Sequence, residues 1–217
     1  ENNFPMGAGI ASSSSAFAAL AKAADSALGL NLSEKELSAA ARLGSGSASR
    51  SIPTGFAEWQ AGDSHESSFA ATIAEPGHWE LIDLVAVVNA GHKITGSGKG
   101  QQLAHTSPLQ ASRVTNAPER LTLTRQAILE KDFEKLADVV EADCNIMHAV
   151  MMTSKPPLLY WDAATVEIIK LVREWRASGL PVFYTIDAGP NVHVLTLPER
   201  ANEVEARLKV VPSVQSV

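Results

Sequence analysis

The chain has 217 residues, of which 45% are hydrophobic and 19% are charged. This length and composition exclude a disordered, collagen-like or coiled-coil chain, and they suit one domain or two small ones. The 18 Lys and Arg residues stand against 24 Asp and Glu residues, for a net charge of -6, and they form no basic block. Because affinity for a phosphate backbone needs clustered cations, nucleic acid is not an expected partner.

The single cysteine, Cys144, excludes an internal disulfide and favours a reducing compartment. No uncharged apolar run reaches the ~18 to 20 residues of a membrane span, and we expect no secretory signal. We therefore expect a cytoplasmic protein without a membrane partner. The chain begins at Glu1 without an initiator Met, and its first motif starts at Pro5, so we expect a piece of a longer protein.

The first part of the chain predicts two helices. The segment AFAALAKAADSAL at 16–28 has apolar residues on all sides and contains no Pro or Gly, which predicts a buried helix over 13–28 that ends at Gly29. Ser33 followed by Glu36 is typical of a capping box and predicts a second helix over 34–43.

The rest of the chain predicts strands and helices that cluster rather than alternate, which indicates an α+β fold. In chain order we expect strands at 56–59, 68–73 and 81–89, a polar loop at 91–100, a mostly helical region at 107–179 broken at 155–157, a loop-linked strand pair at 181–186 and 192–197, a helix at 198–210 and a short strand at 213–217.

The segment 5–15, PMGAGIASSSS, precedes the first predicted helix. Glycines let backbone N–H groups approach an anion, and the helix N-terminus adds unpaired donors and the positive end of its dipole. Serine hydroxyls can bind phosphate oxygens or Mg²⁺. The segment is neither a Walker loop nor a GxGxxG motif. It predicts a phosphate site, with a Gly/Ser turn and a serine N-cap as the alternative.

A second small-residue segment, GSGSASRS at 44–51, ends near Arg50. Alternate hydroxyls and one guanidinium fork can form an anion pocket, because Arg binds carboxylate or phosphate through two parallel hydrogen bonds. The alternative is a flexible loop with a surface arginine. A third segment, TGSGKG at 95–100, either contacts a nucleotide or substrate phosphate or is a solvated loop.

Asp187 directly follows a predicted buried strand and opens the turn Asp187-Ala-Gly-Pro-Asn191. A carboxylate at that place can act as a general base. The alternative is an aspartate that only forms the turn. The six histidines are scattered without metal-ligand spacing, which argues against a zinc site, and Cys144 lies on a helical pattern typical of a core residue.

Three segments occur in order and at suitable spacing: NNFPMGAGIASSSSAFAAL, RLGSGSASRSIPTGFAEW and FYTIDAGPNVHVL. Together they resemble the mevalonate-diphosphate decarboxylases of the GHMP kinase superfamily over nearly the whole chain. The resemblance implies a two-layer α+β fold of the GHMP kinase type, with a mixed β-sheet and helices. Residues 1–90 would be the remainder of the N-terminal ATP- and phosphate-binding domain, and 91–217 the C-terminal domain. Because the family has further residues at both ends, we expect a chain truncated at both ends.

The resemblance implies ATP- and Mg²⁺-dependent decarboxylation of mevalonate 5-diphosphate to isopentenyl diphosphate, in the mevalonate pathway of isoprenoid biosynthesis. In that family ATP phosphorylates the tertiary 3-hydroxyl, and the 3-phosphate leaves as CO₂ departs. The segment 95–100 departs from the family's Ser-Ser-Arg/Thr pattern, so a decarboxylase that converts mevalonate 5-phosphate to isopentenyl phosphate is an alternative. Another small-molecule kinase of the superfamily and a non-catalytic paralogue are further alternatives. Family likeness also implies a homodimer.

The resemblance also implies roles for individual residues. Asp187 would accept the proton of the 3-hydroxyl, Ser13 matches the family's functional serine and is a candidate Mg²⁺ ligand, and Arg50 would hold the substrate carboxylate. The expected substrate-binding residues are Ser45, Ser47, Arg50 and Ser97. The expected contacts to the ATP phosphates are Gly7, Ala8, Gly9, Ala11, Ser12 and Ser13.

Overall fold

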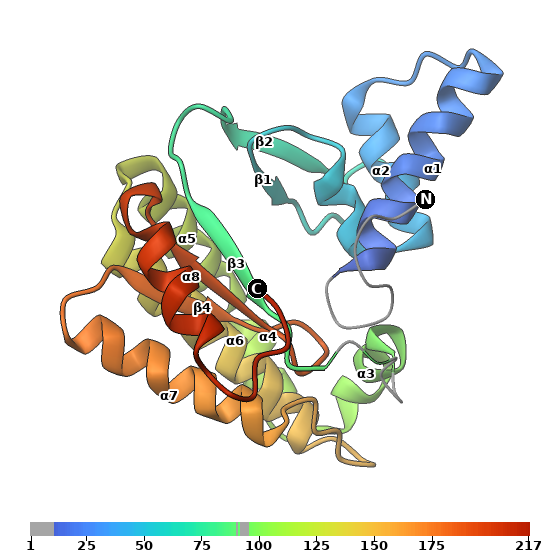
Figure 1. Ribbon diagram of the computed structural model, residues 1–217. Helices are drawn as coiled ribbons and strands as arrows, with labels where there is room; N and C mark the ends of the chain where they lie inside the picture. The colour runs from blue at the N-terminus through green and yellow to red at the C-terminus, as the bar shows by residue number, and fades with distance from the viewer. Residues whose placement is uncertain (1–10, 90, 92–95) are drawn as a thin grey trace. The chain divides into compact units, whose positions relative to one another are not determined.

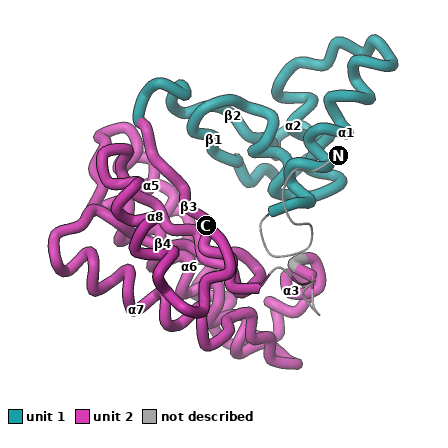
Figure 2. The backbone as a smooth tube through the Cα atoms, in the orientation of Figure 1, with its two compact units in different colours: residues 1–5, 11–79 teal, residues 6–10, 80–217 magenta. Residues whose placement is uncertain are grey.

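The computed structural model describes residues 11–89, 91 and 96–217. These residues form two compact units, Ala11–Trp79 and Glu80–Val217 (Figures 1 and 2). Each unit has its own helices and its own β-sheet. Residues 5–10 of the predicted phosphate segment, which include the predicted contacts Gly7, Ala8 and Gly9, lie outside the described residues.

The two predicted helices of the first unit are present, as α1 (Ser12–Leu28) and α2 (Glu34–Gly44). Gly29 ends α1 in the left-handed conformation, with φ of 61°, and donates its N–H to the carbonyl of Asp25. Ser33 and Glu36 form the predicted capping box, in which Ser33 Oγ accepts the N–H of Glu36 at 3.3 Å and Glu36 Oε2 accepts the N–H of Ser33 at 2.9 Å. Both local predictions are confirmed.

The prediction that α1 is buried is wrong. Within this helix only Ser14 and Ala18 are buried, whereas Leu20 and Leu28 are 62% and 70% exposed. One face of α1 packs against α2 and against the 3₁₀ helix that follows α2. An apolar pattern on every side of a helix indicates what the helix can bury, but it does not supply the element that covers the second face.

The segment 44–51, predicted as a loop, instead ends α2 and forms the 3₁₀ helix η1 (Gly46–Ser51). Its turn is tight because Ser49 Oγ donates to the carbonyl of Gly46 at 2.9 Å. The two strands that follow, β1 (Phe56–Trp59) and β2 (Ala70–Ala74), pair antiparallel and close the unit.

The second unit has a three-stranded sheet in the order β3-β5-β4. Its strands are β3 (Ile82–Ala86), β4 (Val182–Thr185) and β5 (Val192–Thr196), and both pairings are antiparallel. The α+β class is therefore confirmed, although no parallel pair of the implied mixed sheet occurs among the described residues.

The helices of the second unit are α3 (Ser97–Leu103), η2 (Ala104–Thr106), α4 (Gln110–Thr115), α5 (Ala117–Glu130), α6 (Phe133–Met152), α7 (Ala163–Ala177), η3 (Pro198–Arg200) and α8 (Ala201–Lys209). Of these, α6, α7 and α8 pack against the sheet (Figure 1). The core joins Ile168 and Val172 of α7 and Val204 and Leu208 of α8 to inward-facing strand residues such as Val194. No helix in the described part of the chain has both the length and the apolar character needed to cross a bilayer.

Two predicted segments differ in detail. Residues 97–100, expected in a polar loop, form the first turn of α3, and Gly100 is buried. A Cβ at Gly100 would lie 2.5 Å from the Tyr160 hydroxyl, so a larger residue here would force the Tyr160 side chain to shift. The expected strand at 213–217 is reduced to a single bridge between Ser216 and Val87.

A buried ion pair attaches α6 to α7 and to β4. Arg176 Nη1 and Nη2 donate to Glu141 Oε1 and Oε2 at 2.7 Å and 2.9 Å, and Glu141 Oε1 also accepts the N–H of Tyr184 at 3.3 Å. Glu141 is only 7% exposed, and a carboxylate so buried is tolerated only when its oxygens are paired. Although burial opposes the charge, the Glu141 carboxylate raises the pKa of Arg176.

Candidate functional site

Four serine hydroxyls from two distant segments meet beside the N-terminus of α1. Ser13 Oγ lies 3.2 Å from Ser45 Oγ, and Ser45 Oγ lies 3.3 Å from Ser47 Oγ. Ser14 Oγ is hydrogen-bonded to Ser47 Oγ. The structure therefore brings together three predicted residues, Ser13, Ser45 and Ser47, and adds Ser14, which the sequence did not single out. We call these four residues the serine cluster.

The start of α1 next to the serine cluster carries no side-chain cap. Ala11 is the N-cap residue, with φ of 43° and ψ of 30°, and its carbonyl accepts the N–H of Ser14 at 3.0 Å. Helix N-termini present N–H groups and positive dipole ends, and hydroxyls add neutral donors, so this donor set fits phosphate oxygens. The predicted phosphate contacts Ala11, Ser12 and Ser13 all lie here.

Ser13 also provides one ligand type that a hard cation accepts. Ser13 is exposed, and a hydroxyl oxygen is a ligand type that Mg²⁺ accepts together with phosphate oxygens and water. No group of three or more His, Cys, Asp or Glu side chains that could hold a metal occurs among the described residues. Ser13 stays the candidate protein ligand for Mg²⁺ that the sequence predicts.

Arg50 lies on η1 and is exposed, as a ligand-binding arginine must be. Its guanidinium carbon is 6.0 Å from the centre of the Trp59 ring, a separation at which the ring attracts the cation. Arg50 forms no ion pair within the described part of the chain, so its two-pronged donor face is available to an anion.

A buried serine, Ser38, fixes η1 in place. Ser38 Oγ donates to the carbonyl of Ser49 at 2.9 Å and accepts the N–H of Ala70 at 2.9 Å, and Ser38 is fully buried. One hydroxyl thus joins α2, η1 and β2. Sequence reasoning missed Ser38 because a lone serine inside a helical pattern carries no motif.

Asp187 belongs to the second unit, where it follows β4 and is exposed. The turn that it opens is closed by a bond from the Gly189 N–H to the Asp187 carbonyl at 2.8 Å. Asn191, at the end of the turn, is fully buried and is therefore more than a neighbour of a turn-forming aspartate.

The far end of this turn is bonded to two other elements. Asn191 Oδ1 accepts the N–H groups of Val88 and Asn89 at 2.9 Å and 3.0 Å, and Asn191 Nδ2 donates to the Asn89 carbonyl at 3.0 Å. Thr165 Oγ1 of α7 donates to the Pro190 carbonyl at 2.6 Å. The carboxylate of Asp187 is thus presented by a backbone that has little freedom to move.

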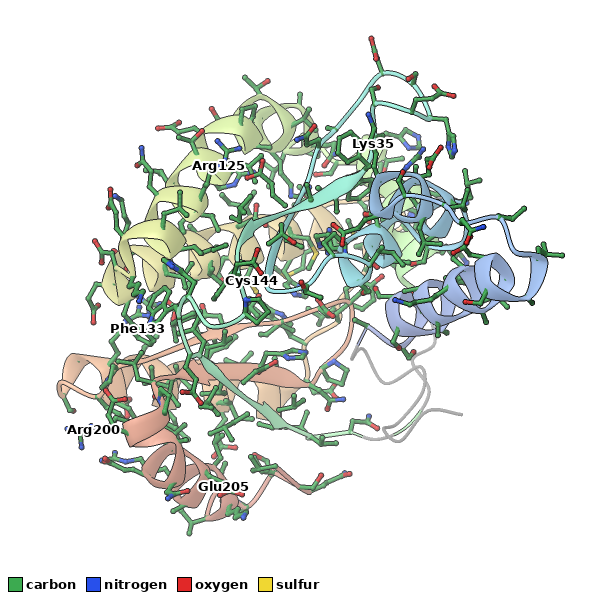
Figure 3. All side chains as sticks on the ribbon, turned by 90° about the horizontal axis from the view of Figure 1, so that it is seen from above. Lys35, Arg125, Phe133, Cys144, Arg200 and Glu205 are labelled. Carbon is green, nitrogen blue, oxygen red and sulfur yellow. The ribbon has the colours of Figure 1, made fainter. Side chains whose placement is uncertain are left out.

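The near end of the turn meets α6. The Ile186 carbonyl accepts a hydrogen bond from His148 Nε2 at 3.1 Å and a longer one from Cys144 Sγ at 3.7 Å. Because a carbonyl only accepts, His148 carries its proton on Nε2. Burial lowers the pKa of His148 to about 4 and raises the pKa of Cys144 to about 11. Cys144, labelled in Figure 3, is a buried core residue as predicted, and its thiol is not activated.

A second histidine titrates in the opposite direction. His193 on β5 donates from Nδ1 to Asp83 Oδ2 on β3 at 2.8 Å. Burial opposes its charge, but the hydrogen bond and the charge of Asp83, with a smaller contribution from Asp187, raise the pKa of His193. The charge of Asp187 therefore influences an imidazole on the neighbouring strand.

Of the remaining predicted residues, Ser97 begins α3 in the second unit. The position of its side chain lies outside the described part of the structure, so its predicted contact with substrate stays a prediction.

Two family models match the chain. The model described as the mevalonate 5-diphosphate decarboxylase C-terminal domain matches residues 83–216. The model described as the diphosphomevalonate decarboxylase-like N-terminal domain matches residues 1–70.

Individual relatives agree with these matches. The chain is 40% identical to the diphosphomevalonate decarboxylase of Homo sapiens over 212 residues, which cover 94% of this chain and 52% of that protein. It is 40% identical, with a TM-score of 0.90, to the crystal structure of mevalonate diphosphate decarboxylase from Staphylococcus aureus, covering 96% of this chain and 63% of the other. A solved structure described as MDDEF in complex with MVAPP, AMPPCP and magnesium is 42% identical with a TM-score of 0.89, covering 94% of this chain and 63% of the other. The chain spans about half the length of the curated relatives it matches.

Replacing Ser38 with Ala should unfold the first unit more readily. The change leaves the buried N–H of Ala70 and the buried carbonyl of Ser49 without their partner, which should lower the free energy of unfolding by about 2–4 kcal/mol. Urea unfolding followed by circular dichroism measures this loss. Ser26→Ala, on an exposed position of α1, is the matched control and should change stability by less than about 0.5 kcal/mol. Equal effects of the two variants would contradict the role of Ser38.

The buried, neutral state of His148 predicts a pH dependence of stability. Its pKa falls from an unfolded value of 6.5 to about 4, so between these values the unfolded chain binds more protons, and stability decreases as the pH falls. The full effect corresponds to about 3 kcal/mol, is absent above the unfolded pKa, and should disappear in His148→Gln. Urea unfolding at a series of pH values from 7 to 4 tests this. The exposed-site variant His105→Gln should keep the slope of the wild type, and an unchanged slope in His148→Gln would refute the assignment.

Proposed function

The chain belongs to the mevalonate 5-diphosphate decarboxylase family, and from that membership we propose that the protein catalyses the ATP-dependent decarboxylation of mevalonate 5-diphosphate to isopentenyl diphosphate. The observation that carries the proposal is the exposed Asp187 carboxylate on a turn bonded at both ends. The description of a similar solved structure as a complex with MVAPP, AMPPCP and magnesium supports it.

In this proposal the first unit binds the nucleotide and part of the substrate. Gly7, Ala8, Gly9 and the start of α1 hold the ATP phosphates, with residues 1–90 as the ATP- and phosphate-binding domain and 91–217 as the C-terminal domain. Ser13 is the candidate protein ligand for Mg²⁺, which would neutralise the charge of the ATP phosphates. Ser45, Ser47 and Ser97 donate hydroxyl hydrogen bonds to the substrate.

Arg50 orients the substrate carboxylate. Its planar fork donates two parallel hydrogen bonds to the two carboxylate oxygens, which fixes the plane of the group that is later lost as CO₂. The absence of an internal ion pair to Arg50 in the described residues supports this role.

Asp187 acts as the general base. A tertiary alcohol is a poor nucleophile, and Asp187 accepts the proton of the 3-hydroxyl as that oxygen bonds to the γ-phosphorus of ATP and ADP leaves. The bond from C3 to oxygen then breaks with its electron pair, releasing phosphate. The electron pair of the bond to the carboxylate becomes the new carbon–carbon double bond, and CO₂ departs.

The substrate alternatives differ in their products. Incubation of the protein with Mg-ATP and either mevalonate 5-diphosphate or the 5-monophosphate, with ADP and CO₂ measured together, separates them. ADP with CO₂ identifies the decarboxylase and its substrate. The monophosphate is included because the segment 95–100 departs from the family's pattern. ADP without CO₂ would mean a kinase, and neither product would mean a non-catalytic paralogue.

From family likeness we also propose that the protein is a homodimer and that it is cytoplasmic.

Asp187→Asn should abolish turnover without changing the fold. The amide has nearly the same shape but cannot accept the hydroxyl proton, so kcat should fall by about 10²–10⁴-fold. Coupled ADP and CO₂ assays measure kcat, and circular dichroism checks the fold. Asp138→Asn, on an exposed position of α6, is the matched control. Normal turnover in Asp187→Asn would eliminate this residue as the base.

Arg50→Lys should impair the use of substrate more than the use of ATP. An ammonium keeps the charge but not the paired hydrogen bonds, so kcat/KM for the mevalonate substrate should fall by about 10–100-fold while KM for ATP stays near the wild-type value. Arg173→Lys, exposed on α7, is the control. An unchanged kcat/KM in Arg50→Lys would remove Arg50 from the site.

A further inference from the structure

The strand that leads to Asp187 lies at an edge of its sheet. In the order β3-β5-β4, β4 has a strand neighbour on one side only among the residues that the structure describes. An edge strand presents a row of backbone N–H and C=O groups without strand partners, and those that are buried must find partners elsewhere. Tyr184, at 1% exposure, and Ile186, at 2%, are both buried.

One face of α6 supplies those partners. Glu141 accepts the N–H of Tyr184 at 3.3 Å, and His148 donates to the carbonyl of Ile186 at 3.1 Å. Cys144 adds a longer contact to the same carbonyl at 3.7 Å. Residues 141, 144 and 148 are three and four positions apart, so they share one helix face. The polar face of α6 is thus matched to the free edge of β4.

The orientation of His148 is itself fixed. Its ring packs against Trp161 and Tyr160, with ring centres 4.8 Å and 6.1 Å away, and it is 2% exposed. A leucine would occupy much of the same space without donating a hydrogen bond. The imidazole therefore does more than fill volume, because among the described residues it is the side chain that gives the Ile186 carbonyl a donor at ordinary hydrogen-bond distance.

Ile186 immediately precedes Asp187, so the direction of its carbonyl sets the peptide plane from which the Asp187 backbone starts. Thr165 and Asn191 hold the other end of the turn. We propose that His148 is a positioning residue for Asp187, holding the carbonyl of Ile186 so that the Asp187 carboxylate is directed at the substrate hydroxyl. This inference rests on the proposed function, in which Asp187 is the base.

Paired variants at position 148 test the inference. His148→Leu removes the donor, and His148→Gln retains an Nε2–H donor near the same place. Because small misplacements of a catalytic group strongly slow the reaction, kcat of His148→Leu should fall by about 10–100-fold, with KM for ATP within about twofold of the wild type. His148→Gln should recover most of kcat. Val172→Ala, a cavity variant in the same core, should lose stability but keep its kcat.

A second measurement does not depend on activity. Amide hydrogen exchange of the peptides that cover 184–191 should be faster in His148→Leu than in the wild type, and near wild type in His148→Gln. Faster exchange in His148→Leu but not in His148→Gln, together with a loss of kcat in His148→Leu but not in His148→Gln, supports the inference. Unchanged kcat in His148→Leu, or equal kcat losses in the leucine, glutamine and Val172→Ala variants, would overturn it.

Failure of the proposed function gives a different result. If the wild-type protein forms neither ADP nor CO₂ with either substrate, the role of Asp187 as base fails, and the exchange data alone decide whether His148 holds the turn. Equal exchange in the wild type and His148→Leu would then overturn the positioning role as well.

Discussion

The fixed backbone around Asp187 is the constraint on which the second unit depends. The carboxylate itself is exposed, but the residue before it is bonded to His148, and the end of its turn is bonded to Thr165 and to the backbone at 88–89 through Asn191. These bonds come from α6, from α7 and from the segment that directly follows β3, so three parts of the second unit hold the turn. The general-base role that we propose for Asp187 needs such an arrangement, because a base must reach the substrate and yet be aimed at one proton.

In the first unit, a buried polar side chain fixes the backbone that carries the exposed Arg50. Arg50 is exposed on a short 3₁₀ helix, and the buried hydroxyl of Ser38 ties that helix to α2 and β2. Irregular backbone near a site has carbonyl and N–H groups that regular ladders do not satisfy, and buried polar side chains take their place. In both units the side chain that we propose as functional has solvent access, while a neighbouring buried polar side chain holds its backbone.

The local features of this fold could be predicted from the sequence, whereas the contacts between distant segments could not. The capping box at Ser33 and the left-handed Gly29 were predictable because their geometry depends on a few adjacent residues. The serine cluster was predictable only as two separate segments, since the contact between Ser13 and Ser45 spans 32 positions. Ser38 and His148 were not predictable as supporting residues, because single polar residues on helices form no pattern until the packing places a backbone group opposite them. The expected burial of α1 failed for a related reason, since a helix pattern does not specify its neighbours.

The most direct test is a crystal structure of the protein with Mg²⁺, an unreactive ATP analogue and mevalonate 5-diphosphate. The account predicts that an Asp187 carboxylate oxygen lies within about 3 Å of the substrate 3-hydroxyl, the distance at which a base can take its proton. It also predicts that the Ile186 carbonyl keeps its bond from His148 in that complex. A substrate hydroxyl bonded to another residue, with the Asp187 carboxylate turned away from it, would contradict the account.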